Sequence, residues 1–172
     1  MRSTDDGLTW AENVQLNGYR MFDIIEHSSA LYSTGWHWSS ETGYQAQLWR
    51  NHGDGWVLAD GVQPYRYPRL TAFGNMLIAW HTGNQSLIDC VTGVEYPVIF
   101  PHIPNLCKPF AVAADWLYCL DGHDYIWRTT DLETWERYSY IANAISIGYW
   151  PSQNCLVVSD KGANAKLWRI AL

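Results

Sequence analysis

The feature that most constrains this fold is a repeat with a period of about 40 residues. A tripeptide of an aliphatic residue, Trp and Arg recurs as Leu48-Trp49-Arg50, Ile126-Trp127-Arg128 and Leu167-Trp168-Arg169. The last two tryptophans are 168 − 127 = 41 residues apart, and the first two are 127 − 49 = 78 apart, which is two periods. The missing copy falls midway, at Leu87-Ile88-Asp89. The chain therefore contains four units of one repeat.

A second series of tripeptides has the same period. Its members each follow a turn signal, and they are Leu31-Tyr32-Ser33, Leu77-Ile78-Ala79, Leu117-Tyr118-Cys119 and Leu156-Val157-Val158. The composition, with 11 Trp, 11 Tyr and 13 Gly in 172 residues, favours strands and tight turns over helices. A unit of this length suits a four-stranded blade of a β-propeller, so we predict an all-β fold.

Each unit is predicted to contain four antiparallel strands, except that the last lacks its fourth. The predicted strands are 19–25, 30–36, 44–50 and 56–59; 69–73, 76–80, 86–90 and 96–100; 110–113, 116–120, 125–128 and 135–140; and 144–149, 155–159 and 166–170. We assign residues 1–172 to one propeller domain, with blades at about 17–60, 64–101, 108–141 and 143–172, the last completed by residues 9–16.

Two stretches share a further pattern of turn residues. Ser3, Asp5, Gly7 and Trp10 match Ser-x-Asp-x-Gly-x-Thr-Trp, while Thr129, Asp131 and Trp135 form a copy that is one residue shorter and lacks the glycine. The pattern resembles the Asp-box of sialidase-like (BNR repeat) propellers. The resemblance implies a turn between the third and fourth strands of a blade, in which the Asp and Ser/Thr side chains accept hydrogen bonds from turn amides and the Trp fills the space between blades.

The N-terminal copy also indicates how the ring closes. Residues 10–16 directly follow it, in the place of a fourth strand, and can complete the last blade. Such closure would remove the open sheet edges of a linear array. We therefore expect a closed ring of four blades, and the alternative is a fragment of a larger propeller.

Functional residues are expected on the face opposite the Asp-box turns, where loops of every blade converge. Arg20, Arg69 and Lys108 lie at the entry to first strands and offer an anion site, although each can equally pair with an acid or point to solvent. The loops after second strands offer aromatic and polar groups that suit a sugar. These candidates are Trp36, Trp38, Trp80, His81 and His123. The alternative for a tryptophan in such a loop is that it caps the core.

The sequence does not contain the catalytic set that the resemblance would require of a sialidase. That set includes three arginines for the substrate carboxylate, a Tyr–Glu nucleophile pair and an acidic Asp. Arg50, Arg128 and Arg169 instead lie toward the Asp-box side, and Lys108 cannot form the bidentate clamp of an arginine. We therefore expect no catalytic residues, no cofactor and no metal, with Asp121, His123 and Asp124 as the weaker alternative of a metal-binding loop.

The charge balance bears on partners. The net charge of −6 disfavours a nucleic-acid backbone, and no apolar run is long enough to insert in a membrane. No signal peptide is recognisable, so we expect synthesis in the cytoplasm. The predicted function is a non-enzymatic binding or assembly module, with a virion-associated structural or receptor-binding role first. The partner would then be another protein of a larger assembly or a surface glycan. A soluble lectin is the alternative, and a sialidase-like glycosidase comes third.

Overall fold

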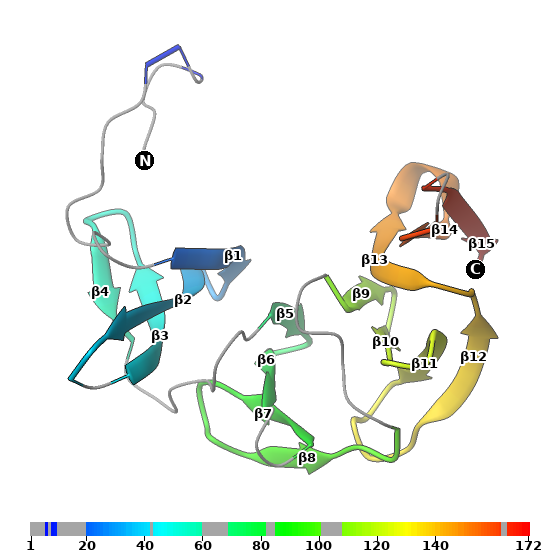
Figure 1. Ribbon diagram of the computed structural model, residues 1–172, viewed down its shortest axis with the longest axis horizontal. Helices are drawn as coiled ribbons and strands as arrows, with labels where there is room; N and C mark the ends of the chain where they lie inside the picture. The colour runs from blue at the N-terminus through cyan, green and yellow to red at the C-terminus, as the bar shows by residue number, and fades with distance from the viewer. Residues whose placement is uncertain are drawn as a thin grey trace.

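The computed structural model describes residues 6, 8–9, 20–41, 43–59, 69–81, 85–100, 108–162 and 165–172. Over these residues the protein is all-β, and four small antiparallel sheets are arranged as a four-bladed β-propeller (Figure 1). In each sheet, strands that follow one another in the chain lie side by side. The fold therefore has the meander topology that the repeat predicts.

Sheets 1 to 4 are named in chain order. Sheet 1 contains β1 (Arg20–His27), β2 (Ala30–Ser39), β3 (Gly43–Asn51) and β4 (Trp56–Leu58). Sheet 2 contains β5 (Leu70–Phe73), β6 (Met76–His81), β7 (Ser86–Asp89) and β8 (Glu95–Pro97). Sheet 3 contains β9 (Phe110–Ala113), β10 (Trp116–Leu120), β11 (Tyr125–Thr129) and β12 (Glu136–Tyr140). Sheet 4 contains β13 (Ala144–Trp150), β14 (Cys155–Asp160) and β15 (Leu167–Ala171).

All fifteen strands predicted between residues 19 and 170 are present, and their ends differ from the predicted ones by at most three residues. Sheet 4 has three strands among the described residues, as the sequence indicated. The predicted closing strand at 10–16 lies outside the described residues.

Tight turns connect the first and second strands of three sheets. The loop of sheet 1 is Ser28-Ser29, with φ angles of 49° and 62°. Two residues with positive φ match the right-handed twist of the flanking strands, which is why this loop can be so short. The corresponding turn of sheet 4 is longer: a 3-10 turn at Pro151–Gln153 leads to Asn154, whose φ is 43°. Asn154 is thereby placed on the side of sheet 4 that faces sheet 3.

The core consists of three apolar layers, one between each pair of consecutive sheets. Sheets 1 and 2 enclose Ala30, Tyr32, Leu48, Ala59, Leu70, Leu77, Ala79, Ile88 and Cys90. Sheets 2 and 3 enclose Phe73, Ile78, Trp80, Leu87, Phe100, Phe110, Leu117, Cys119, Leu132 and Trp135. Sheets 3 and 4 enclose Ala111, Ala113, Tyr118, Leu120, Ile126, Ile141, Ala144, Ile147, Leu156 and Val158. Each fully buried Leu, Ile or Phe contributes roughly 1.5–3 kcal/mol, so these layers hold the sheets together.

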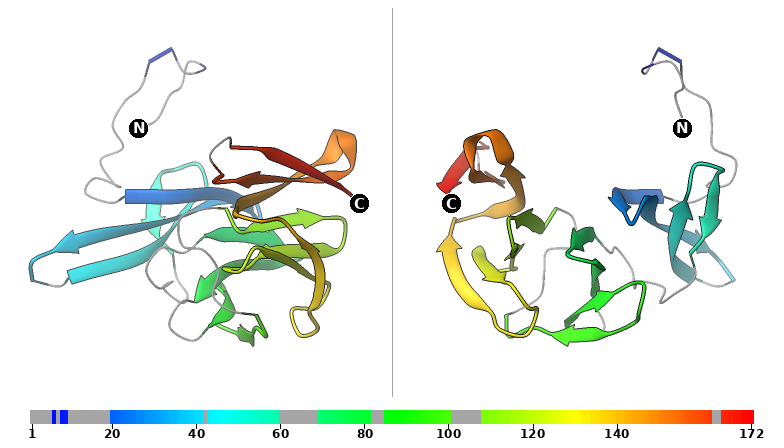
Figure 2. Two further views of the ribbon diagram at one scale, coloured as in Figure 1. Left: turned by 45° about the vertical axis from the view of Figure 1, so that its right-hand side comes forward. Right: turned by 180° about the vertical axis from the view of Figure 1, so that it is seen from behind.

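The first strands of the sheets lie toward the centre, and the last strands lie outside (Figure 1). Consecutive first strands contact one another: β1 with β5, β5 with β9 and β9 with β13. Among the described residues, β13 makes no contact of that extent with β1. Sheets 1 and 4 stand at the two ends of an arc, both in Figure 1 and in the right-hand view of Figure 2.

Candidate functional site

The tryptophans predicted to form a ligand platform differ in their exposure. Trp80 is only 3% exposed and lies in the layer between sheets 2 and 3, so its assignment as a binding residue is wrong. Trp36 is also buried, and the guanidinium carbon of Arg20 lies 5.2 Å from its ring centroid. Trp38, at 56% exposed, is the described member of this set that offers an open ring. Trp36 and Trp38 are two residues apart on β2 and so point to the same face, and Trp38 is the one nearer the end of the strand.

The other predicted binding residues lie on several elements. Lys108 is exposed, and its carbonyl oxygen accepts a hydrogen bond of 2.9 Å from the Ile147 amide. Arg69 is half-buried, and His123 is exposed. His81 ends β6, and its side chain is outside the described set. Of the described candidates, Arg20 and Trp36 are brought into direct contact.

The turn between β11 and β12 is built on two side chains that the sequence identified. The Asp131 carboxylate accepts hydrogen bonds from the amides of Glu133 (2.9 Å) and Thr134 (2.7 Å), and Thr129 Oγ1 accepts one from Leu132 (2.9 Å). The amides of Thr134 and Glu133 also lower the pKa of Asp131. Trp135 is buried, and its indole donates to the Leu132 carbonyl oxygen at 3.2 Å. The counterpart residues Ser3, Asp5, Gly7 and Trp10 lie outside the described residues.

The structure shows a repeated hydrogen bond, between an Asp carboxylate and a Trp indole, that sequence analysis missed. Asp121 Oδ2 accepts a hydrogen bond of 2.7 Å from the Trp127 indole, and Asp160 Oδ2 accepts one of 2.8 Å from the Trp168 indole. In both cases the other carboxylate oxygen accepts two amide hydrogen bonds of the same loop. The residues of the two pairs are six and eight positions apart, and this unequal spacing concealed the repetition.

The loop considered for a metal contains two of the carboxylates. Asp121 is buried and accepts three hydrogen bonds, and Asp124 Oδ2 accepts the Asn143 amide at 2.8 Å. Within the part of the chain that the structure describes, no group of three His, Cys, Asp or Glu residues is placed to hold a metal ion. Nor does any described segment form a helix with the length and apolarity required to cross a membrane.

A pocket with a volume of about 280 Å³ lies between sheets 3 and 4. It is at the end of the sheets opposite to the expected binding face, beside the turns that join β9 to β10 and β13 to β14. Its lining residues are Ala113, Ala114, Trp116, Tyr118, Arg128, Tyr138, Asn154 and Leu172. None of the binding residues predicted from the sequence is among them.

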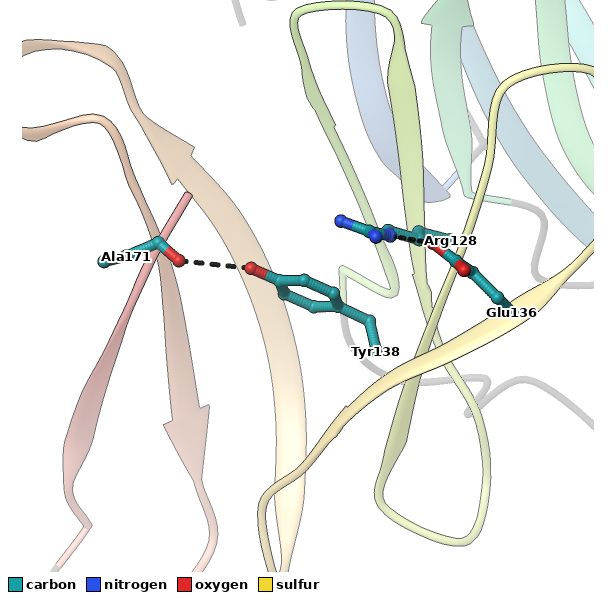
Figure 3. A network of polar contacts seen from close by, with 4 residues as sticks. All are labelled: Arg128, Glu136, Tyr138 and Ala171. Atoms are coloured by element: carbon teal, nitrogen blue, oxygen red, sulfur yellow. Dashed lines mark hydrogen bonds and ion pairs between the residues drawn. The ribbon is translucent and has the colours of Figure 1, made fainter.

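Arg128 is the central side chain of this pocket. Its guanidinium carbon lies 4.3 Å from the ring centroid of Trp116 and 4.6 Å from that of Tyr138, so the cation is held against two aromatic rings. Its Nε atom forms an ion pair with Glu136 on the neighbouring strand. Figure 3 shows the remaining guanidinium nitrogens pointing away from Glu136, toward sheet 4.

Sheet 4 forms the opposite wall through its last residues and the turn before β14. The Tyr138 hydroxyl donates a hydrogen bond of 3.1 Å to the carbonyl oxygen of Ala171 (Figure 3). Asn154 accepts a hydrogen bond of 3.1 Å from the Tyr149 hydroxyl, and its amide donates one of 3.4 Å to the Leu172 carbonyl. The bond from Tyr138 to Ala171 thus bridges the two sheets at the pocket itself, and the bonds of Asn154 fix the wall that sheet 4 provides.

The charge state of the pocket follows from these contacts. Burial raises the pKa of Tyr118, which outweighs the opposing effect of its hydrogen bond with Arg128. Burial acts to lower the pKa of Arg128, but the hydrogen bonds with Glu136 and Tyr118 raise it overall. The phenol is therefore neutral and the guanidinium charged across the physiological range. The pocket combines fixed hydrogen-bond donors with aromatic and aliphatic walls.

Comparisons with known proteins support the fold. No protein-family model matches the chain, and no curated protein matches it. A solved structure described as that of the computationally designed Ika4 protein is similar, with a TM-score of 0.56 and 14% sequence identity. The match covers 95% of this chain and 100% of that chain. At this identity the similarity shows the architecture alone.

The sequence contained a partial signal for the pocket. Arg128 belongs to the repeated Trp-Arg pair, which marked it as one copy of a structural element. Trp116, Tyr118 and Tyr138 have the alternation of ordinary strand residues. Only the pairing of three strands, which sets Tyr118 opposite Arg128 and Arg128 opposite Glu136, shows that these groups converge.

Proposed function

We propose that this protein is a non-enzymatic binding module, and that the pocket between sheets 3 and 4 binds a sugar residue of a glycan. The observation that carries the proposal is the guanidinium of Arg128, held between Trp116 and Tyr138 with nitrogens directed into the space beside sheet 4. An arginine fixed in this way loses little conformational freedom when it donates to a ligand.

The chemistry of the lining fits a sugar. A pyranose has hydroxyl groups on its edge and apolar C–H groups on its faces, so it needs both donors and apolar walls. Arg128 and the Tyr118 hydroxyl supply the polar groups, whereas Trp116 and Leu172 supply apolar surface. The volume of about 280 Å³ is near the lower end of ligand pockets, which favours one sugar ring over a long chain.

The proposal includes membership of the sialidase-like, Asp-box class of propellers. The hydrogen bonds of Thr129 and Asp131 support it, because they satisfy the turn amides as the resemblance implies. We do not extend the proposal to hydrolysis. Glu136, the acid that contacts the pocket's arginine, is held in an ion pair and is not positioned as a free proton donor.

A glycan array tests the proposal, with the wild-type protein and the variants Arg128→Lys, Arg137→Lys and Trp38→Ala compared at equal concentration. Arg128→Lys keeps the charge but loses the planar set of donors, and we expect affinity for the bound glycan to fall about tenfold or more, which corresponds to about 1.4 kcal/mol. Arg137→Lys is the matched control. Arg137 lies on the adjacent strand and also packs on aromatic rings, 4.1 Å from the centroid of Tyr125, but it does not line the pocket.

The outcomes are distinct. Retention of binding in Arg137→Lys and its loss in Arg128→Lys would support the pocket as the site. An array with no bound glycan, or binding that Arg128→Lys leaves unchanged, would refute the proposal. Binding that is lost instead in Trp38→Ala would place the lectin site on the face predicted from the sequence.

An assembly role is the second candidate, and a specific observation favours it. Leu31, on sheet 1, and Leu167, on sheet 4, are exposed apolar side chains on regular strands. Apolar surface on the outermost sheets of a repeat array commonly marks a protein contact. In this role the protein would be a structural or receptor-binding component of a larger particle, such as a virion.

A further inference from the structure

On the second strand of every sheet, two adjacent residues occupy equivalent positions in the repeat, as Leu77 and Ile78 do in sheet 2. The exposure of these two side chains shows how well each face of the sheet is covered. Neighbouring strand residues point to opposite faces, so the first position faces the preceding sheet and the second faces the following one. In the interior sheets both positions are buried: Leu77, Ile78 and Leu117 are 0% exposed, and Tyr118 is 2% exposed. Two complete layers of apolar side chains cover them.

The same positions lose their cover at the ends of the arc. Leu31, the first position of sheet 1, is 41% exposed, although its counterparts Leu77, Leu117 and Leu156 are all at 0%. Val157, the second position of sheet 4, is half-exposed. The apolar character of these positions is kept along the chain's own repeat, but no apolar layer among the described residues covers them at the ends of the arc.

Each end therefore has a free face with several apolar side chains. The free face of sheet 1 contains Leu31, Ile24 (61% exposed) and Leu58, which the strand register places on one side. The free face of sheet 4 contains Val157, Trp150 and Leu167, the last at 74% exposed. These side chains lie on strands and not on loops.

The two free faces are also of the two different kinds that pack on each other within the chain. At each of the three existing junctions, the following face of one sheet packs on the preceding face of the next. The free face of sheet 4 is a following face, and the free face of sheet 1 is a preceding face. They carry opposite exposed charges, Arg169 on sheet 4 and Glu26 on sheet 1. They are the two halves of a fourth junction of the same kind.

We infer that this junction forms between two copies of the chain. Sheets 1 and 4 of one copy stand at opposite ends of the arc and do not meet (Figures 1 and 2). Two arcs related by a two-fold axis would pack each sheet 4 on the partner's sheet 1, giving two identical junctions and no remaining free face. The assembly would be a ring with eight sheets. It does not depend on the sugar pocket, which lies within one chain.

Sedimentation velocity and light scattering of the whole chain test the inference. We expect a particle of two chains, each of 19.8 kDa, at micromolar concentration. Leu167→Glu and Ile24→Glu change exposed positions on the two free faces, so each should leave the fold intact and weaken the dimer about 100-fold or more, because a charge would be buried without a partner. Val94→Glu is the control, since Val94 is 49% exposed but lies in the turn between β7 and β8.

The outcomes of these measurements are distinct. A dimer that both face variants dissociate, while Val94→Glu does not, supports the inference. A monomer at all concentrations up to about 100 μM would overturn it, and would favour closure within one chain. A dimer that is insensitive to Leu167→Glu and Ile24→Glu would also overturn it, as would open polymers in place of a closed pair. An intact dimer without glycan binding would refute the proposed function alone.

Discussion

Leu132 is a position where two physical effects oppose each other, and its substitution measures both. The residue lies in the turn between β11 and β12 with a φ of 66°, in the left-handed region that favours glycine. A leucine there costs about 1–2 kcal/mol in backbone strain. Its side chain, however, is 0% exposed and belongs to the layer between sheets 2 and 3. Removing such a side chain costs about 3–5 kcal/mol.

The magnitudes predict an order of stability. Leu132→Ala loses the burial and keeps the strain, so we expect destabilisation of about 3 kcal/mol. Leu132→Gly loses the same buried side chain but removes the backbone strain of about 1–2 kcal/mol. This gain is partly offset, by about 0.5–1 kcal/mol, because glycine has greater conformational freedom in the unfolded chain. The net cost of Leu132→Gly is then about 2 kcal/mol. Glycine should therefore be better than alanine, and both should be worse than leucine.

Urea unfolding followed by tryptophan fluorescence measures these differences, because Trp135 packs in the same layer and its indole donates to the Leu132 carbonyl. In a chain of this length 1 kcal/mol corresponds to about 2–4 °C in melting temperature, so a thermal scan gives an independent check. A Leu132→Gly protein as stable as the wild type would refute the dominance of burial. A Leu132→Ala protein more stable than Leu132→Gly would refute the strain.

Two further predictions concern the carboxylates that fix the loops. Asp121→Ala should destabilise the protein by about 3 kcal/mol, because it leaves two amides and the Trp127 indole without their acceptor. Asp124→Ala removes the acceptor of one exposed amide and should cost about 1 kcal/mol. Equal losses of unfolding free energy in urea for the two variants would contradict this difference. The Trp168 indole and the amides of Lys166 and Gly162 lower the pKa of Asp160 from its ordinary value. The stabilisation that the charged carboxylate provides is therefore complete above the pKa of the unfolded chain, and it is lost as the pH falls through the pKa of the folded protein. The difference in unfolding free energy between wild type and Asp160→Asn should therefore shrink below about pH 4, and a difference independent of pH would show that the charge is not stabilising.

The architecture could be predicted from the sequence because its signals are local and repeated. A strand such as β9, predicted at 110–113 and observed at the same residues, has a turn signal at its end and a partner of matching length. The ends of β8 were predicted less well, at 96–100 against Glu95–Pro97. Pro97 has no amide hydrogen to donate to the ladder, and the strand ends at this residue.

The candidate site was not predictable in the same way. Trp80 follows an apolar strand and precedes a polar loop, which suggested exposure, but the layer between sheets 2 and 3 extends far enough to cover it. Arg128 was recognised only as a repeated residue, since its environment is made by Trp116 from the preceding strand and Tyr138 from the following strand. Contacts of this kind depend on register and side-chain direction, and not on spacing along the chain.

The sequence of apolar layers determines how stability is distributed over the protein. Sheets 2 and 3 are each packed on both faces, whereas sheets 1 and 4 are each packed on one within the chain. Detaching an end sheet breaks one layer, while opening an interior sheet breaks two. Local unfolding should thus begin at the ends and reach β6 and β10 last, as in a linear array governed by nearest-neighbour contacts. The pocket that we propose to bind a sugar lies between sheets 3 and 4, in one of the two end layers. The part of the chain proposed to bind a ligand is therefore also among the first parts to unfold locally.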